Sequence, residues 1–422
     1  MWLARGVAAN RDFVRLWGAE AISRVGTQVS LLALPLTAIF TLHARPAQLG
    51  LIGAAQFAPV LVVTPLAGAW TDTHRRRPVI VAANWGRAAV LGSVPLLYGL
   101  DALRIEWLYA AAFLAGALTA AFDVAYLSYV PSLVRPDELT SANSALQASY
   151  SAAQVVGPSL GGLLVEAFSA PVAVLVDAVS YAVAALGVHR IRRPEPEPPP
   201  GGGEHVYARI VQGLRATFGD RHLAPLALES AWFNLFEQAV LTIFPLYATR
   251  ELGLSAGLLG ATLTVGSVGA LAGSLVARPL GRRIGFGGAT ILAVVLASAG
   301  PALLVGPAGG AAAGALPFLF GAFALYGAGT TVFNVHATTL RQAVVPNELL
   351  GRVTASWRLV SYGTIPIGSL LGGTLGQAIG LRETLVVAAS ALGVGAVAFA
   401  LSPIGALRRL PAPAVDRASR RL

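Results

Sequence analysis

The sequence predicts an all-α integral membrane protein in which twelve transmembrane helices form two pseudo-symmetric bundles of six. Three observations support this prediction. Hydrophobic residues make up 55% of the 422 residues and charged residues only 12%, well below the roughly 25% charged residues of a soluble domain. Apolar segments of about 18 to 30 residues recur, and each is long enough to cross a hydrocarbon core about 30 Å thick. Related stretches also repeat at a spacing of roughly 210 residues.

Twelve apolar segments are expected to span the membrane. They begin near Val14, Leu49, Val79, Trp107, Leu139, Val172, Leu223, Leu258, Ala289, Ala315, Leu349 and Leu385. An even number of spans places both termini on one side, and basic residues accumulate in cytoplasmic loops. Most arginines fall at one face, whereas the opposite loops hold Arg45, Arg104, Arg250 and Arg382. We therefore expect a multi-pass protein of the bacterial cytoplasmic (inner) membrane with both termini in the cytoplasm.

A proline- and glycine-rich break separates the sixth and seventh expected spans. Its sequence, HRIRRPEPEPPPGGGEH, runs from His189 to His205. Such a composition is typical of a linker. We expect an N-terminal six-helix bundle over residues 1–189, a cytoplasmic linker over 190–221, a C-terminal six-helix bundle over 222–407 and a cytoplasmic tail over 408–422.

The two expected bundles show related motifs. A shift of about 210 residues places Arg135-Pro136-Asp137-Glu138-Leu139 on Val345-Pro346-Asn347-Glu348-Leu349, and Pro35 of the first span on Pro245 of the seventh. Many secondary transporters consist of two such halves, with the substrate site near the membrane midplane between them.

The sequence lacks the residues that several other classes of function require. The chain has no cysteine, and its six histidines show no metal-binding spacing. It has no lysine, so no phosphate-binding loop is present, and its arginines are not interleaved with aromatic residues as in nucleic-acid-binding proteins. We expect a monomer without enzyme activity, cofactor, metal or nucleic-acid partner, whose ligands are a small-molecule substrate, protons and membrane lipid.

The segment GAWTDTHRRR, Gly68–Arg77, lies between the second and third expected spans. It resembles the loop signature G-x-x-x-D-R-x-G-R-R of the major facilitator superfamily. Gly68, Asp72, Arg76 and Arg77 agree with this signature, whereas Thr73 and Arg75 depart from it. The resemblance implies a gating role, in which Asp72 interacts with the start of the eleventh span near Arg358. The same arginines would also serve as a simple cytoplasmic anchor.

The fifth expected span holds a second signature, Gly157-Pro158-Ser159-Leu160-Gly161-Gly162. It resembles the fifth-helix motif of drug/proton antiporters in the same superfamily. Glycines allow close backbone approach, and neighbouring helices tolerate the proline bend. We expect Gly266, Gly269 and Gly273 of the eighth span to form the facing surface. The run Val130–Gly162, with Leu350-Gly351-Arg352-Val353, is most similar to the macrolide-efflux and enterobactin-exporter group. Helix packing without any bearing on transport direction is the alternative.

Ionisable residues inside membrane spans are costly and therefore are functional candidates. Glu20 and Arg24 are four residues apart and can pair on one helix face. Asp123 and Arg87 lie at similar depths on neighbouring spans. Each pair is a candidate either for a structural ion pair or for proton coupling.

A polar stripe marks the seventh span, formed by Ser230, Asn234, Glu237 and Gln238. The repeat aligns it with Glu20, Arg24, Thr27 and Gln28 of the first span, and we expect both stripes to line a central cavity. No cation on the same helix pairs with Glu237, and burial favours the protonated carboxyl. Glu237 is therefore the first candidate to carry a proton, followed by Asp123 and Glu20. The alternatives are that Glu237 binds a cationic substrate or is hydrogen-bonded and inert.

Further residues are expected at the substrate cavity. Asn334 and His336 of the tenth span are candidates for this cavity, and His336 is a candidate either for a proton relay or for simple polar packing. Aromatic residues expected to supply apolar contacts are Trp232, Phe233, Phe236, Tyr150, Tyr326 and Trp357.

These features together predict a secondary exporter of a hydrophobic or amphipathic small molecule, such as a drug, macrolide or siderophore, driven by proton antiport with alternating access. The alternatives are a proton-coupled uptake symporter on the same fold and a non-transporting membrane sensor.

Overall fold

A computed structural model of the protein describes residues 7, 9–71, 73–193, 195, 206–306 and 312–410. Within these ranges the chain consists of helices and short connections and contains no β-strand. Two compact units are present, one comprising Met1–Gly202 with Leu254–Thr264, the other Gly203–Gly253 with Val265–Leu422.

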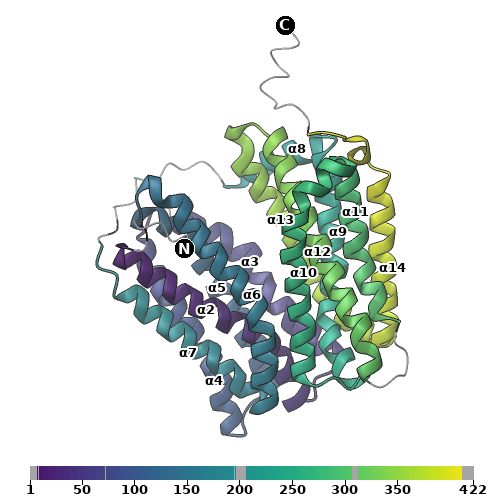
Figure 1. Ribbon diagram of the computed structural model, residues 1–422. Helices are drawn as coiled ribbons and strands as arrows, with labels where there is room; N and C mark the ends of the chain where they lie inside the picture. Colours follow the sequence, from purple (N-terminus) through teal and green to yellow (C-terminus); the bar gives the residue numbers. More distant parts are fainter. Residues whose placement is uncertain are drawn as a thin grey trace. The chain divides into compact units, whose positions relative to one another are not determined.

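The first unit contains six long helices (Figure 1). They are α2 (Arg11–Leu36), α3 (Pro46–Thr71), α4 (Arg76–Gly99), α5 (Ile105–Leu133), α6 (Leu139–Ala167) and α7 (Ala170–His189). A π-helical turn, Thr37–Thr41, extends α2, and a 3₁₀ turn, Pro136–Glu138, precedes α6. Asn10 caps α2, because its side chain accepts hydrogen bonds from the backbone N–H groups of Asp12 and Phe13.

The second unit repeats this arrangement. Its long helices are α9 (Leu223–Arg250), α10 (Ala256–Ile284), α11 (Phe286–Leu304), α12 (Ala312–Val344), α13 (Asn347–Ala378) and α14 (Leu381–Ala400), and the first turns of α10 belong to the first unit. A short helix, α8 (Val206–Gly219), precedes α9, and a 3₁₀ turn, Pro403–Ala406, follows α14.

The packing within each unit confirms the repeat expected from the sequence. In the first unit α2 packs against α6 and α7, and α4 against α5 and α7. In the second unit the equivalent helix α9 packs against α13 and α14, and α11 against α12 and α14. Pro35 in α2 and Pro245 in α9 lie at matching positions.

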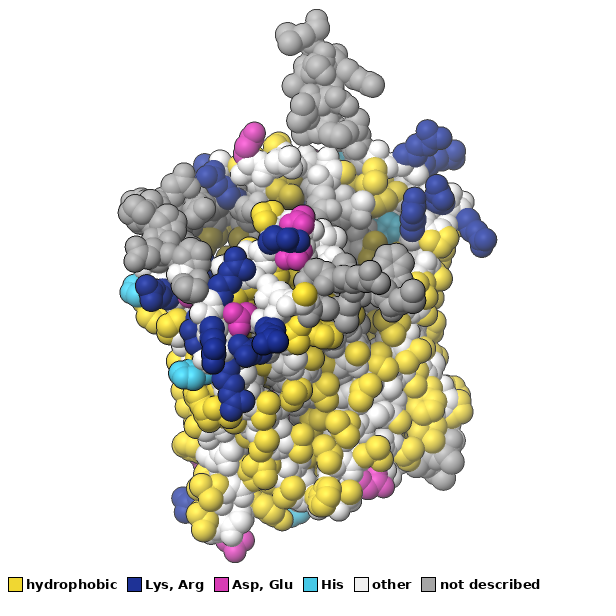
Figure 2. Space-filling view, turned by 60° about the vertical axis from the view of Figure 1, so that its left-hand side comes forward, with side chains coloured by type: hydrophobic (Ala, Val, Ile, Leu, Met, Phe, Trp, Pro, Cys, Tyr) yellow, Lys and Arg dark blue, Asp and Glu magenta, His cyan; other side chains and the backbone are white. Residues whose placement is uncertain are grey.

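Nine helices of the described residues are long and apolar enough to cross a membrane. Three further helices, α6, α9 and α13, have 29, 28 and 32 residues and reach the required length, but carry more polar side chains. Together, the nine apolar helices and the three more polar ones are consistent with the twelve predicted spans. Hydrophobic side chains dominate the surface over the helices in Figure 2, whereas arginines gather toward one end.

The segment expected to be a plain linker makes specific contacts at both of its ends. The carboxylate of Glu195 accepts hydrogen bonds from the backbone N–H groups of Arg76 and Arg77 at 2.7 and 3.0 Å, at the start of α4. Near the other end, the hydroxyl of Ser356 in α13 donates to the backbone carbonyl of Ile210 in α8 at 3.1 Å. The linker therefore includes a helix and anchoring residues.

Candidate functional site

A cavity of about 240 Å³ lies among α9, α11, α12 and α13 in the second unit. Helix α9 contributes five of its lining residues at helical spacing, so that one face of this helix forms a wall. The lining consists of Glu229, Ser230, Phe233, Asn234, Glu237, Val294, Ala297, Tyr326, Thr330, Phe333, Asn334, Trp357, Ser361 and Tyr362.

Glu237 is held by a tyrosine inside this cavity. The hydroxyl of Tyr326 in α12 donates a hydrogen bond to Oε1 of Glu237 in α9. The ring of Phe233 stacks on the ring of Tyr326, with centroids 6.4 Å apart. From the sequence we predicted only an apolar contact for Tyr326. Its hydrogen bond to Glu237 was missed because no local sequence pattern indicates that α12 packs against α9 at this position.

The charged residues among the cavity-lining side chains are all acidic. They are Glu229 and Glu237, and Glu229 is buried. A carboxyl group in such surroundings either takes up a proton or requires a cation nearby. The cavity can therefore accept protons or a positively charged group, and its five aromatic side chains offer apolar contact to a ring-bearing molecule.

Two further residues of the predicted stripe lie in this cavity. Asn234 donates from Nδ2 to the backbone carbonyl of Ser361 at 2.8 Å and so ties α9 to α13. The hydroxyl of Ser230 donates to the carbonyl of Leu226 in its own helix. Asn334 also lines the cavity, whereas Gln238 bonds to Thr242 and is not among the lining residues.

Three further residues predicted for the cavity, besides Gln238, lie elsewhere in the second unit. The indole N–H of Trp232 donates to the carbonyl of Ala391 in α14 at 2.7 Å, and Phe236 packs against this indole, with centroids 4.8 Å apart. Gly395 explains the position of Trp232, since a Cβ there would overlap the indole ring. His336 follows Asn334 by two residues, about 200° around α12, and lines a different cavity.

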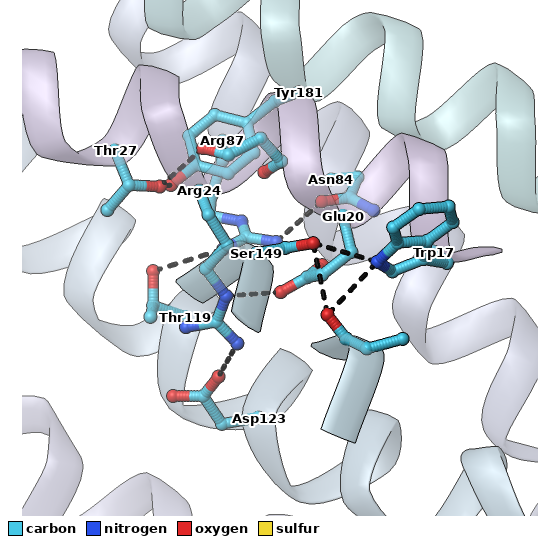
Figure 3. Close-up of polar contacts among 12 residues, drawn as sticks. Trp17, Glu20, Arg24, Thr27, Asn84, Arg87, Thr119, Asp123, Ser149 and Tyr181 are labelled. Carbon is cyan, nitrogen blue, oxygen red and sulfur yellow. Dashed lines mark hydrogen bonds and ion pairs between the residues drawn. The ribbon is translucent and has the colours of Figure 1, made fainter. Parts of the chain in front are cut away.

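The polar residues of the first unit form an ion-pair network (Figure 3). Nε of Arg24 lies 2.5 Å from Oε1 of Glu20, and an Nη atom of the same guanidinium lies 3.8 Å from Oδ1 of Asp123. The predicted Glu20–Arg24 pair is thus present. The guanidinium also lies over the ring of Tyr150, 5.3 Å from its centroid.

From their similar depths, Arg87 was expected to pair with Asp123, but its side chain lies in a different environment. Its buried guanidinium lies between the rings of Phe122 and Tyr181, at 4.3 and 4.1 Å from their centroids. It donates to Oδ1 of Asn84 at 2.5 Å. The structure brings Asp123 to Arg24, since α5 packs its Asp123 side chain toward α2.

The remaining first-span residues connect α2 to its neighbours. The hydroxyls of Thr27 and Tyr181 lie 2.8 Å apart and join α2 to α7. Gln28 packs against Gly157 of α6, where an added Cβ would overlap the glutamine side chain.

The glycine signature of α6 packs against α2 and against the first turns of α10. Gly161 lies against Val29, whereas Gly162 and the carbonyl of Pro158 lie against Gly257 and Gly260. The predicted facing surface was therefore wrong. Gly266, Gly269 and Gly273 instead pack against Phe323, Ala324 and Ala328 of α12.

Hydrogen bonds reinforce this contact. Oε2 of Glu166 in α6 accepts from the hydroxyl of Ser255 at 2.9 Å and from the backbone N–H of Gly257 at 2.8 Å. The carboxylate thereby satisfies a free N–H at the start of α10. The hydroxyls of Ser159 and Thr264 form a further hydrogen bond of 2.7 Å.

The loop signature before α4 is only partly described. Asp72 lies outside the described residues, and Arg358 is exposed on α13. A Cβ on Gly68 would meet no atom within 4 Å. The start of α4 is held by Glu195, which sequence analysis missed because this residue lies about 120 positions away in a proline-rich segment. Nη2 of Arg77 also donates to the carbonyl of His189 at 2.5 Å.

Comparison with known families gives a consistent result. Residues 16–355 and 233–420 match the Major Facilitator Superfamily. The chain belongs to this superfamily. It is therefore a multi-pass membrane transporter, as the motifs and the repeated helix packing predicted.

Named members of the superfamily align over most of the chain. The multidrug efflux pump Tap of Mycobacterium tuberculosis is 28% identical over 420 residues, covering 94% of this chain and 95% of the pump. The enterobactin exporter EntS of Citrobacter koseri is 27% identical over 386 residues, covering 87% of this chain and 85% of the exporter.

Solved structures of the superfamily share the fold. The nucleoside transporter NupG superimposes with a TM-score of 0.71 at 13% identity, covering 92% of this chain and 98% of NupG. A bacterial homologue of the iron transporter ferroportin gives a TM-score of 0.72 at 19% identity, covering 92% of this chain and 98% of the homologue.

Proposed function

We propose that this transporter exports an amphipathic small molecule from the bacterial cytoplasm in exchange for protons. Two relatives that align over most of the chain are named as an efflux pump and an exporter. The Gly157–Gly162 signature resembles that of drug/proton antiporters and also supports transport out of the cell. Enzyme activity is not part of this proposal.

Glu237 carries the exchanged proton in this proposal. We call the cavity lined by Glu229 and Glu237 the acidic cavity. The observation that carries the assignment is that the Glu237 carboxyl lies in this cavity and accepts a hydrogen bond from Tyr326. Proton release from Glu237 leaves a negative charge that a positively charged substrate can neutralise. Uptake of a proton reverses this preference, so that the two ligands favour different conformations of the transporter.

Glu20 and Asp123 remain second candidates for proton coupling. Both carboxylates lie near the guanidinium of Arg24, which stabilises their charged forms. When a carboxylate in an ion pair is protonated, it loses the electrostatic attraction to its cation. Glu237, whose hydrogen-bond donor is a neutral hydroxyl, is the simpler carrier.

The substrate fits the cavity best as an amphipathic cation with aromatic or other apolar rings. Both charged lining residues are acidic, and Phe233, Tyr326 and Trp357 offer flat apolar surfaces. We propose that Ser230, Asn234 and Asn334 supply polar contacts.

Topology and gating form the remaining part of the proposal. We place both termini and the segment 190–221 in the cytoplasm, between bundles at 1–189 and 222–407, and treat the transporter as a monomer. Gly68, Asp72, Arg76 and Arg77 form a cytoplasmic gate, with Arg358 as a candidate partner. Gly157, Pro158, Gly161 and Gly162 allow the close approach of α6 to its neighbours.

Inverted membrane vesicles with an acidic interior and a pH-sensitive dye test this function. Lipophilic cations, macrolides and siderophores are added to the wild type and to Glu237→Gln. The expected result is a proton leak triggered by lipophilic cations that disappears in Glu237→Gln. Glu251→Gln, which changes an acid just beyond the end of the same helix, is the matched control and should keep the leak.

Other outcomes would decide against parts of the proposal. A leak that persists in Glu237→Gln would move the proton site to Asp123 or Glu20. Protons that move in the same direction as the compound would favour uptake symport. No response to any compound from correctly inserted protein would contradict transport of these substrates and favour a sensor.

A further inference from the structure

A second cavity, of about 460 Å³, lies where α10, α12 and the segment after α14 meet in the second unit. It is separate from the acidic cavity, because the two share no lining residue. Its lining consists of Ala277, Arg278, Gly281, Arg282, Phe286, Val335, His336, Thr339, Arg408, Arg409 and Leu410. We call it the basic cavity.

The basic cavity contains positive charge without a matching acid. Arg278 and Arg282 come from the last turns of α10, whereas Arg408 and Arg409 follow the 3₁₀ turn after α14. Among the residues that the structure describes, none of these four guanidinium groups forms an ion pair with a carboxylate. Like charges that share a cavity repel one another, and a bound anion would relieve this repulsion.

A buried histidine forms part of the wall. The side chain of His336 is 5% exposed, and its Nδ1–H donates to the carbonyl of Val332 at 2.8 Å. Nε2 lies on the side of Gly281, 3.1 Å from the position that a Cβ would occupy there. This close approach favours glycine at position 281, and His336 lines the same cavity as the two arginines of α10.

Backbone hydrogen bonds fix the main chain that leads to the other two arginines. The N–H of Gly287 donates to the carbonyl of Leu407 at 2.7 Å, and the N–H of Phe286 donates to the carbonyl of Arg408 at 3.3 Å. Gly285, with a positive φ of 84°, makes the turn that starts α11 beside this segment. The backbone at Leu407 and Arg408 is therefore fixed beside the cavity, so that Arg408 and Arg409 start from a defined position on its rim.

The depth of the cavity corresponds to the headgroup layer. Arg278 lies 22 residues after Ala256, the first residue of α10, which is about 33 Å along the helix at 1.5 Å per residue. This length is close to the roughly 30 Å of the hydrocarbon core. Beside the cavity, Leu275, Val276 and Ile284 of α10 are 78, 47 and 50% exposed, which provides an apolar surface next to the charges.

We propose that the basic cavity binds the phosphate group of an anionic ligand, and that the adjoining apolar surface makes this ligand an anionic phospholipid. Guanidinium groups bind phosphate oxygens through paired, charge-assisted hydrogen bonds. Basic pockets at the cytoplasmic ends of membrane helices suit anionic headgroups, and the exposed leucine, valine and isoleucine suit acyl chains. The site does not depend on the direction of transport or on proton coupling.

Native mass spectrometry of the full-length protein in detergent tests the site, with phosphatidylglycerol, phosphatidylcholine and soluble glycerol 3-phosphate as probes. Wild type should retain phosphatidylglycerol in preference to phosphatidylcholine. The double variant Arg278→Gln/Arg282→Gln should bind phosphatidylglycerol about tenfold more weakly or worse, because two headgroup contacts are lost. Arg283→Gln removes a neighbouring exposed arginine that does not line the cavity, and should bind like the wild type.

Each outcome bears on the proposal. If Arg283→Gln and the double variant lose phosphatidylglycerol binding equally, the lipid is attracted only to the basic surface in general, and the proposed site is overturned. Retention of both lipids alike would also overturn it. Arginine-dependent binding of glycerol 3-phosphate as tight as that of the lipid would keep a phosphate site but reject the lipid. If the double variant fails to fold, Arg408→Gln/Arg409→Gln provides the same comparison.

Discussion

Arg24 holds two carboxylates with one guanidinium group. Replacing it by glutamine leaves Glu20 and Asp123 without this cation, so we expect Arg24→Gln to lower the free energy of unfolding by about 1–3 kcal/mol. This value lies between those for surface and buried pairs, because the Asp123 side chain is 50% exposed. Thermal unfolding in detergent measures the change.

A second variant separates charge balance from lost packing. Arg24→Gln/Asp123→Asn removes one of the two carboxylate charges and should recover part of the lost stability. If the double variant is as unstable as the single one, the guanidinium acts mainly through its packing on Tyr150.

Tyr326 positions the acid that we propose as proton carrier. Tyr326→Phe removes the hydroxyl that donates to Glu237 but keeps the aromatic ring. A hydrogen bond to a charged group contributes about 1.5–3 kcal/mol, so we expect compound-driven proton flux to fall about tenfold or more. The vesicle assay measures this flux. Tyr362→Phe changes another tyrosine of the same lining, and an equal loss there would argue against a specific role of Tyr326.

Sequence periodicity correctly grouped Ser230, Asn234 and Glu237 on one side of a helix, because these positions recur at helical spacing. It could not identify their partners on other helices. The Tyr326 hydroxyl reaches Glu237 from a position 89 residues away, and Trp232 turns toward α14 because a glycine leaves room there. Such contacts depend on tertiary packing, which no local pattern contains.

At the scale of elements, the glycines of α6 and α10 set how closely these helices pack. A Cβ at Gly162 would overlap the backbone carbonyl of Ala256, so we expect Gly162→Ala to cost about 1–3 kcal/mol and to reduce transport. Thermal unfolding and the vesicle assay measure both effects. Gly393→Ala in α14 meets no atom within 4 Å, so it should be neutral or stabilising by up to about 1 kcal/mol. Equal effects of both substitutions would contradict a packing role for Gly162.

Glu166 caps α10 from a neighbouring helix. Glu166→Ala removes the acceptor for the Ser255 hydroxyl and the Gly257 N–H, and we expect a loss of about 1 kcal/mol. Glu166→Gln keeps an acceptor oxygen and should lose less. Thermal unfolding of the two variants gives the comparison, and identical stability of Glu166→Ala and wild type would exclude the cap as a stabilising contact.

The twelve long helices of the described residues were predictable because a membrane span needs about twenty mostly apolar residues, a pattern that nine helices meet fully and α6, α9 and α13 meet in length with more polar side chains. Each predicted span starts within four residues of the start of an observed helix. The partner of the α6 glycines was not predictable, since α10 carries small residues along several turns and only packing selects Gly257 and Gly260. Helix α8 was missed because it is short and lies in a segment that begins with prolines.

For the whole molecule, the proposed topology allows a direct test because the chain contains no cysteine. A single introduced cysteine is therefore a unique label site. Ala102→Cys lies in the exposed loop between α4 and α5, and Thr73→Cys lies in the exposed loop before α4. In intact cells a membrane-impermeant maleimide should label Ala102→Cys alone, and lysis should expose Thr73→Cys. The reverse pattern would invert the topology.

The repeat relates the two polar sites position by position. The correspondence pairs Glu20 with Ser230, Arg24 with Asn234 and Thr27 with Glu237. The N-terminal half thus carries an ion pair where the C-terminal half is neutral, and Glu237 stands about two turns further along than the position equivalent to Glu20. Two halves built on one plan thus differ in chemistry, with a charged framework in one half and, in our proposal, an exchangeable charge in the other.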